Sequence, residues 1–169
     1  TGFVAVWSRL LGLVRPWWLQ QSVTFALGVA RHLSIIGLGV VSALLVGAVF
    51  RGEDLTLFLA LLGGFAPLTA LFTWAESWQS HDLAYKLLAE MRIDIYDKLE
   101  PLAPAYMVKR RSGDLVSVVG GDVETIEYFF AHTISPGFVA IVVPVGVLAT
   151  LSFIAWPLAL VLSPFLLSV

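Results

Sequence analysis

Two basic side chains interrupt the first long apolar run of the chain. Arg31 and His32 are the only ionisable residues in segment 17–50. A charge at the centre of a bilayer costs about 2.5–3.5 kcal/mol on insertion scales, so it should face other helices or a water-filled cavity. Two interpretations remain open. Either these residues contact an anionic substrate in a translocation pathway, or Arg31 pairs internally with a backbone carbonyl or with a carboxylate of another span.

Glu76 and His81 follow the second apolar run. Glu76 either lines the same cavity or marks the boundary with water. His81 is followed by Asp82, and a neutral imidazole whose tautomer is fixed by a carboxylate can be an axial haem ligand. The plainer alternative is an interfacial histidine at a helix exit. No catalytic acid–base pair and no cluster of metal ligands converges at helical spacing, so neither a metal site nor a membrane enzyme is predicted.

The composition identifies the solvent in which these residues fold. The chain has 169 residues, of which 59% are hydrophobic and 13% charged, with a mean hydropathy of +0.90. Soluble domains average about 45–50% apolar residues, so membrane lipid is the expected partner. The net charge of −2 offers no basic face for nucleic acid. Because there is no cysteine, disulfides and thiolate metal sites are excluded.

The apolar runs predict an all-α membrane protein. Crossing about 30 Å of hydrocarbon takes about 20 helical residues. We expect an amphipathic surface helix at 3–15, a first span at 17–50, a second helix at 55–100, a third span at 122–155 and the start of a fourth at 158–169. Lys and Arg concentrate before the first span and between the second and third, which places the N-terminus in the cytoplasm.

The second helix should continue far beyond the membrane. After Glu76, apolar residues recur at three- and four-residue spacing and form one stripe: Ala84, Leu87, Leu88, Met91, Ile95, Leu99 and Leu102. The pairs Asp82–Lys86 and Asp94–Lys98 have the i,i+4 spacing of stabilising ion pairs. The predicted extension is nearly 40 Å long, at about 1.5 Å per residue.

A short polar turn follows this extension. Ser112 or Asp114 can cap a new helix, Gly113 gives the turn backbone freedom, and the acidic segment from Asp122 should begin the next helix. The turn is either an element that docks on a partner or an ordinary capped connection. The length of the extension favours docking.

Several stretches around this turn resemble the first intracellular loop of ABC exporter membrane domains. They are Arg92-Ile-Asp-Ile-Tyr-Asp-Lys-Leu, Pro104-Ala-Tyr and Arg111-Ser-Gly-Asp-Leu-Val-Ser-Val-Val-Gly-Gly-Asp-Val-Glu. The resemblance implies a coupling helix at 111–119 that contacts a nucleotide-binding domain. The residues implied in that contact are Arg111, Ser112, Gly113, Asp114, Leu115, Val116 and Asp122.

The same resemblance implies partners and cofactors. They are a second half-transporter, identical or different, a small-molecule cargo, and ATP with Mg²⁺. Because the sequence has no phosphate-binding loop, we expect the ATPase to lie outside this chain. Residues 128–169 carry no charged side chain and the sequence stops within this apolar run, so we expect part of a longer, multi-pass protein of a bacterial inner membrane.

A narrower resemblance concerns the thiol-reductant exporter of cytochrome bd assembly, and its second subunit in particular. Ser80-His81-Asp82 and Lys98-Leu-Glu-Pro-Leu-Ala-Pro-Ala carry it. It implies cysteine or glutathione as cargo and a haem at His81. Two alternatives stay open: an ABC transporter of a peptide, lipid, drug or siderophore, and a membrane scaffold or channel subunit that does not use ATP.

Overall fold

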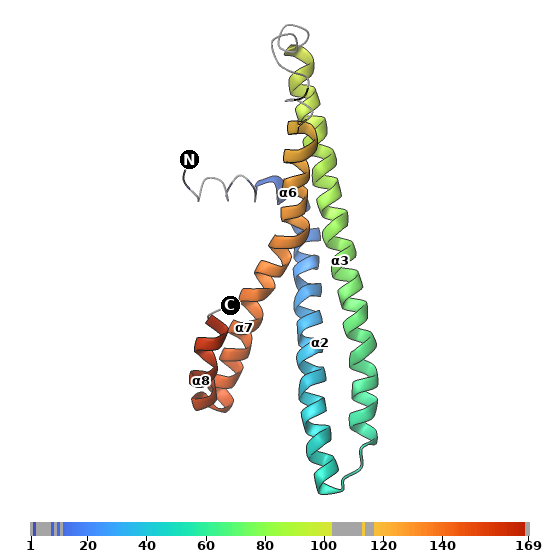
Figure 1. Ribbon diagram of the computed structural model, residues 1–169, viewed down its shortest axis with the longest axis vertical. Helices are drawn as coiled ribbons and strands as arrows, with labels where there is room; N and C mark the ends of the chain where they lie inside the picture. Colours follow the sequence, from blue (N-terminus) through green and yellow to red (C-terminus); the bar gives the residue numbers. More distant parts are fainter. Residues whose placement is uncertain are drawn as a thin grey trace. The chain divides into compact units, whose positions relative to one another are not determined.

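The structure, a computed structural model, describes residues 12–102 and 117–167 together with Gly2, Ser8, Leu10 and Gly113. These residues form helices and no strand (Figure 1). The elements are η1 (Arg15–Trp17), α2 (Trp18–Arg51), α3 (Thr56–Leu99), η2 (Glu100–Leu102), η3 (Val118–Asp122), α6 (Val123–Phe129), η4 (Phe130–Ile134), α7 (Ser135–Ile154) and α8 (Trp156–Leu167). The predicted all-α class is confirmed.

Three helical segments are long and apolar enough to cross a membrane. They are Gly12–Arg51, Thr56–Leu102 and Val119–Ile154, and a shorter apolar helix covers Trp156–Leu166. The break before α8 lies at Ala155, one residue before the predicted Trp156-Pro157 break. Pro157 then stands in the first turn of α8, where its missing N–H removes no helical hydrogen bond.

The turn between α2 and α3 is closed by local hydrogen bonds. Gly52 has a φ of 68°, a conformation that suits glycine at a helix C-terminus, and the Glu53 N–H donates to the Ala48 carbonyl at 3.0 Å. Asp54 accepts from the backbone and hydroxyl of Thr56 at 3.1 and 2.7 Å. These two bonds, the hydroxyl bond foremost, lower the pKa of Asp54.

The chain divides into two compact units, which are described separately. The first contains Thr1–Thr24 and Ser77–Ser135, and the second contains Phe25–Glu76 and Pro136–Val169. The first unit has an apolar core, whose buried members are Val14, Leu83, Ala84, Leu87, Phe130 and Ala131. The Ser80 hydroxyl donates to the Ala131 carbonyl at 2.9 Å within this core. That bond joins α3 to the η4 turn.

Close approach of side chains to glycine characterises the second unit. A Cβ on Gly37 would lie 2.9 Å from the Phe65 ring, so α2 and α3 approach closely there. Phe25 of α2 stacks on Phe138 of α7 with ring centroids 4.1 Å apart and an interplanar angle of 11°. The Gly37 contact is typical of membrane helices that pack through small residues.

The helix preceding α7 differs from the prediction. We expected a helix to begin at Asp122, but helical structure is already present from Val118 as the π-helical turn η3, and α6 follows without a gap. Asp122 makes no side-chain cap hydrogen bond. The glycines at 120 and 121, without Cβ atoms, leave the backbone free to adopt this wider turn.

Candidate functional site

Arg31 and Glu76 form an ion pair between α2 and α3. Arg31 Nε lies 2.7 Å from Glu76 Oε2, and the two side chains are 25% and 10% exposed. The Nε–H makes no aligned hydrogen bond within the described residues, so the attraction between opposite charges dominates this contact. Removing one member of a buried pair leaves the other charge uncompensated, which costs about 3–5 kcal/mol when burial is complete.

Gly28 creates the space in which Glu76 is held. A Cβ at position 28 would lie 2.8 Å from both Glu76 Oε1 and Val139 Cγ2. Real Cβ atoms essentially never approach a neighbour that closely. Helices α2, α3 and α7 therefore meet at Gly28, one helical turn before Arg31. Neither Gly28 nor Val139 could be identified from the sequence, because neither residue carries a signal of which helices meet.

The pair lies far from the Arg51–Asp54 turn. Arg31 precedes Arg51 by about 20 residues and Glu76 follows Thr56 by about 20, or about 30 Å along each helix. A hydrocarbon layer of about 30 Å that starts at the turn would end near the pair. Arg31 is near the middle of α2, yet by this measure both charges reach the edge of the apolar layer.

His32 does not join the ion pair. Its Nδ1 lies 2.9 Å from the Gly28 carbonyl one turn earlier in α2, so the ring is held against its own helix. The predicted trio of Arg31, His32 and Glu76 is thus a close pair with an adjacent imidazole. Their proposed contact with cargo stays a prediction.

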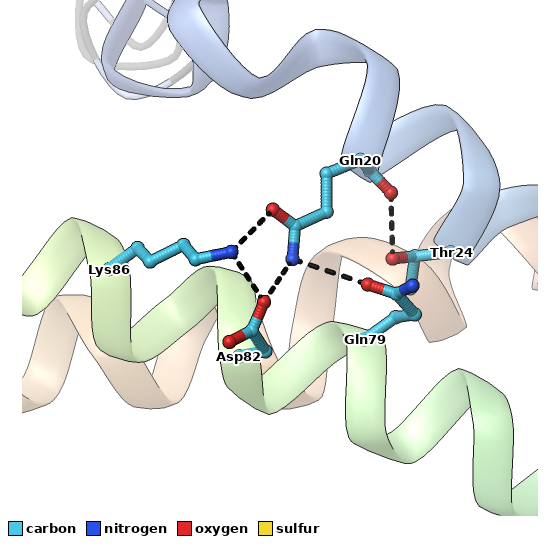
Figure 2. A network of polar contacts seen from close by, with 5 residues as sticks. All are labelled: Gln20, Thr24, Gln79, Asp82 and Lys86. Carbon is cyan, nitrogen blue, oxygen red and sulfur yellow. Dashed lines mark hydrogen bonds and ion pairs between the residues drawn. The ribbon is translucent and has the colours of Figure 1, made fainter.

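A polar network occupies the first unit (Figure 2). Gln20 of α2 donates through Nε2 to Asp82 Oδ2 at 2.6 Å and to Gln79 Oε1 at 3.3 Å. Lys86 Nζ donates to the same Asp82 oxygen at 2.6 Å and to Gln20 Oε1 at 3.3 Å. The predicted Asp82–Lys86 pair is therefore confirmed, but its linkage to α2 through Gln20 was missed.

His81 lies in an aromatic group in the first unit. Its ring meets that of His132 edge to face, with centroids 5.1 Å apart, and His132 lies 4.6 Å from Tyr128. His81 Nδ1 is 2.9 Å from the Ser77 carbonyl. A carbonyl oxygen only accepts hydrogen bonds, so Nδ1 carries the hydrogen in this contact. A backbone carbonyl, rather than the predicted carboxylate, therefore fixes the neutral tautomer, in which Nε2 has no hydrogen.

These contacts test the haem interpretation. The two histidine rings touch, so no porphyrin fits between them and a haem with both as axial ligands does not fit this arrangement. No group of three or more His, Cys, Asp or Glu side chains suited to a metal occurs among the described residues. His81 as a single axial ligand stays a prediction.

Arg92 connects the α3 extension to the helix that returns from the turn. Its Nε donates to the Val119 carbonyl at 3.3 Å, and its Nη2 donates to Glu124 Oε1 at 3.2 Å. The predicted coupling residues 111, 112 and 114–116 lie outside the described residues. Gly113 and Asp122 are described, and both are exposed.

The ABC transporter transmembrane region is the family whose model matches this chain, over residues 1–169. The chain belongs to this family. It is therefore an ABC transporter membrane region, and its long apolar helices make it a multi-pass membrane protein.

Individual ABC proteins resemble the chain at modest identity. A glutathione/L-cysteine transport system ATP-binding/permease protein, CydC of Haemophilus influenzae, is 31% identical over 60% of this chain and 18% of its own length. A probable ABC transporter ATP-binding/permease protein of the same organism is 31% identical over 82% of this chain and 26% of its own length. A fatty acid ABC transporter ATP-binding/permease protein of Mycobacterium bovis is 31% identical over 68% and 18%.

The chain thus spans only a small part of these ABC relatives, 18% and 26% of the first two. Both relatives are named as ATP-binding/permease proteins. The predicted resemblance to ABC exporter membrane domains, including the glutathione and cysteine transporters, is confirmed.

Proposed function

We propose that this chain forms the first part of the membrane domain of an ATP-driven ABC exporter. The observation that carries the proposal is the family match over residues 1–169. Related proteins combine ATP-binding and permease functions in their names. In the proposed protein, ATP and Mg²⁺ act in a nucleotide-binding domain outside this chain, and a second half-transporter completes the pathway.

The proposed coupling element is the segment between α3 and η3. Helix α3 has 44 residues, or about 66 Å at about 1.5 Å per residue, which is about twice the thickness of a hydrocarbon layer. Arg92 joins this extension to Val119 and Glu124. Two helices held together in this way suit the transmission of a push from an ATPase domain to α3 and to the helix that leads into α7.

In this proposal the N-terminus and the turn are cytoplasmic, in a bacterial inner membrane. The concentration of Lys and Arg in these parts of the sequence supports that orientation. The Arg51–Asp54 turn then faces the other side, and the Arg31–Glu76 pair lies toward the cytoplasmic edge of the apolar layer. Cargo entering from the cytoplasm would meet Arg31, His32 and Glu76 early in its path.

The proposed cargo is a small thiol such as cysteine or glutathione. The support is the similarity to proteins named for glutathione and L-cysteine transport. Similarity to a fatty acid transporter and to a mycobactin import protein defines the alternatives. A haem held by His81 would supply redox chemistry to the same protein. In purified protein supplied with haem, a Soret band that is lost in His81→Ala is the expected sign.

The coupling role is tested in the full-length transporter. Replacing Asp114 or Leu115 with Ala should reduce transport per ATP hydrolysed, because the docking contact is lost while the ATPase site is intact. Asp94→Ala is a matched control, since Asp94 lies on the exposed extension and contacts Lys98 at 3.5 Å. Unchanged transport in both turn variants would show that this turn does not couple ATP hydrolysis to transport.

A further inference from the structure

The Arg31 guanidinium has hydrogen-bonding capacity that its ion pair does not use. An arginine carries five N–H donors, one on Nε and four on the two Nη atoms. Glu76 approaches the Nε side at 2.7 Å. Within the described residues neither Nη group donates a hydrogen bond, and Nε is the one Arg31 nitrogen that is buried without an aligned partner. The Nη edge is therefore open.

Arg51 shows the contrast within the same helix. Its Nε and Nη2 donate to the two oxygens of Glu53 at 2.6 and 3.0 Å, so the carboxylate engages two nitrogens at once. Arg51 is also more exposed, with 57% of its side chain accessible. Glu76 instead approaches Arg31 through Oε2 on the Nε side, while its Oε1 lies against Gly28, where an added Cβ would be 2.8 Å away. This one-sided contact orients the guanidinium and leaves its Nη edge free.

We infer that the Nη edge of Arg31 binds a planar or tetrahedral oxyanion, supplied by the cargo as a carboxylate or by a lipid headgroup as a phosphate. Arginine suits either group because its parallel N–H bonds match two oxygens at once. Glu76 and Gly28 are positioning residues, which fix the guanidinium and do not contact the ligand. The cargo source rests on the proposed function, whereas the lipid source does not.

The test compares two lysine substitutions in the full-length transporter in nanodiscs. Arg31→Lys keeps the positive charge beside Glu76 but removes the parallel N–H donors of the guanidinium. Arg51→Lys is the matched control. The probes are reduced glutathione and its diethyl ester, which lacks both free carboxylates. With the wild type, esterification should raise the half-saturating concentration for ATPase stimulation about tenfold. In Arg31→Lys the two probes should differ less than twofold, while Arg51→Lys should behave as the wild type.

A second arm distinguishes the lipid source. Nanodiscs of phosphatidylcholine alone are compared with nanodiscs that also contain phosphatidylglycerol. The measured quantity is the change in ATPase activity that phosphatidylglycerol causes. If Arg31→Lys loses this change and Arg51→Lys keeps it, the site binds a lipid headgroup. If the two lysine variants behave alike toward both probes and both lipids, the oxyanion site is refuted. If wild-type protein does not transport glutathione with ATP, the cargo proposal fails and the lipid arm alone tests the site.

The positioning role of Gly28 has a separate readout. Gly28→Ala displaces Glu76 without removing a charge, so it should weaken the preference for free glutathione over its ester. Gly39→Ala lies in the same helix with nothing within 4 Å of the added Cβ, and it should preserve the preference. A preference that is equal in both alanine variants would refute the positioning role.

Discussion

Gly28→Ala is the substitution that most directly tests the junction of α2, α3 and α7. The added Cβ would lie 2.8 Å from Glu76 Oε1 and from Val139 Cγ2, against 3.4–4 Å for an ordinary contact. Glu76 is restrained by Arg31 and the valine is stiff at χ1, so neither neighbour yields freely. Overpacking of this kind costs about 1–3 kcal/mol. Against it stands a gain of about 1 kcal/mol, because alanine is a better helix former than glycine.

Comparison with Gly39→Ala removes this helix-forming gain, since both positions lie inside α2. We therefore expect Gly28→Ala to be less stable than Gly39→Ala by about 1–3 kcal/mol. The assay is the midpoint of thermal unfolding of the full-length protein in one detergent, where the difference should amount to a few degrees. A midpoint for Gly28→Ala at or above that of Gly39→Ala would refute the close approach of the three helices.

The double variant Gly28→Ala/Val139→Ala identifies the atom responsible. Shortening Val139 removes the Cγ2 atom that the new Cβ would meet. The second substitution should therefore destabilise the Gly28→Ala protein less than it destabilises the wild type, which gives a non-additive cycle. Additive effects at the two positions would mean that they do not contact each other.

Three further predictions concern hydrogen bonds outside this junction. Ser80→Ala leaves the buried Ala131 carbonyl without its donor, and it should lower the free energy of unfolding by about 1–3 kcal/mol, as measured by chemical denaturation beside the exposed control Ser22→Ala. Gln20→Ala should lower it by about 1 kcal/mol, and the loss should be smaller in an Asp82→Ala/Gln79→Ala background, where only the bond from Lys86 to Gln20 of those in Figure 2 remains for this side chain. Bonds from Thr56 lower the pKa of Asp54, so its contribution to stability is present above the unfolded pKa and is lost as the pH falls through the folded one. Thermal midpoints of Asp54→Asn should therefore depend less on pH than wild-type midpoints in the acid range. Parallel plots of midpoint against pH for the two proteins would contradict a stabilising role of the bonds from Thr56 to Asp54.

The sequence predicted features that depend on one helix at a time. Apolar run lengths predicted the all-α class, and three- and four-residue spacing placed Ala84 and Leu87 on a buried face. The spacing omitted Leu83, which is 2% exposed. A stripe of that width is too narrow when one helix packs against two neighbours, as α3 does against residues of the N-terminal segment and of η4.

Features that depend on which helices meet could not be predicted. The internal-pair interpretation of Arg31 allowed a backbone carbonyl or a carboxylate from another span as the partner, and the sequence did not identify that partner as Glu76. Gly28 is one of 14 glycines, and its role follows from the positions of Glu76 and Val139. The π-helical turn at Val118–Asp122 was also missed, because the acidic residues there resemble an ordinary helix start.

ATP-dependent transport by the full-length protein with its partner half-transporter, reconstituted in proteoliposomes, tests the central claim most directly. Radiolabelled glutathione and cysteine are supplied on the side of the nucleotide-binding domains, with ATP or with a non-hydrolysable analogue. We expect the thiols to accumulate inside the vesicles with ATP but not with the analogue, and we expect less transport per ATP when Asp114 is replaced. Thiol movement at the same rate with and without hydrolysable ATP would contradict the central claim.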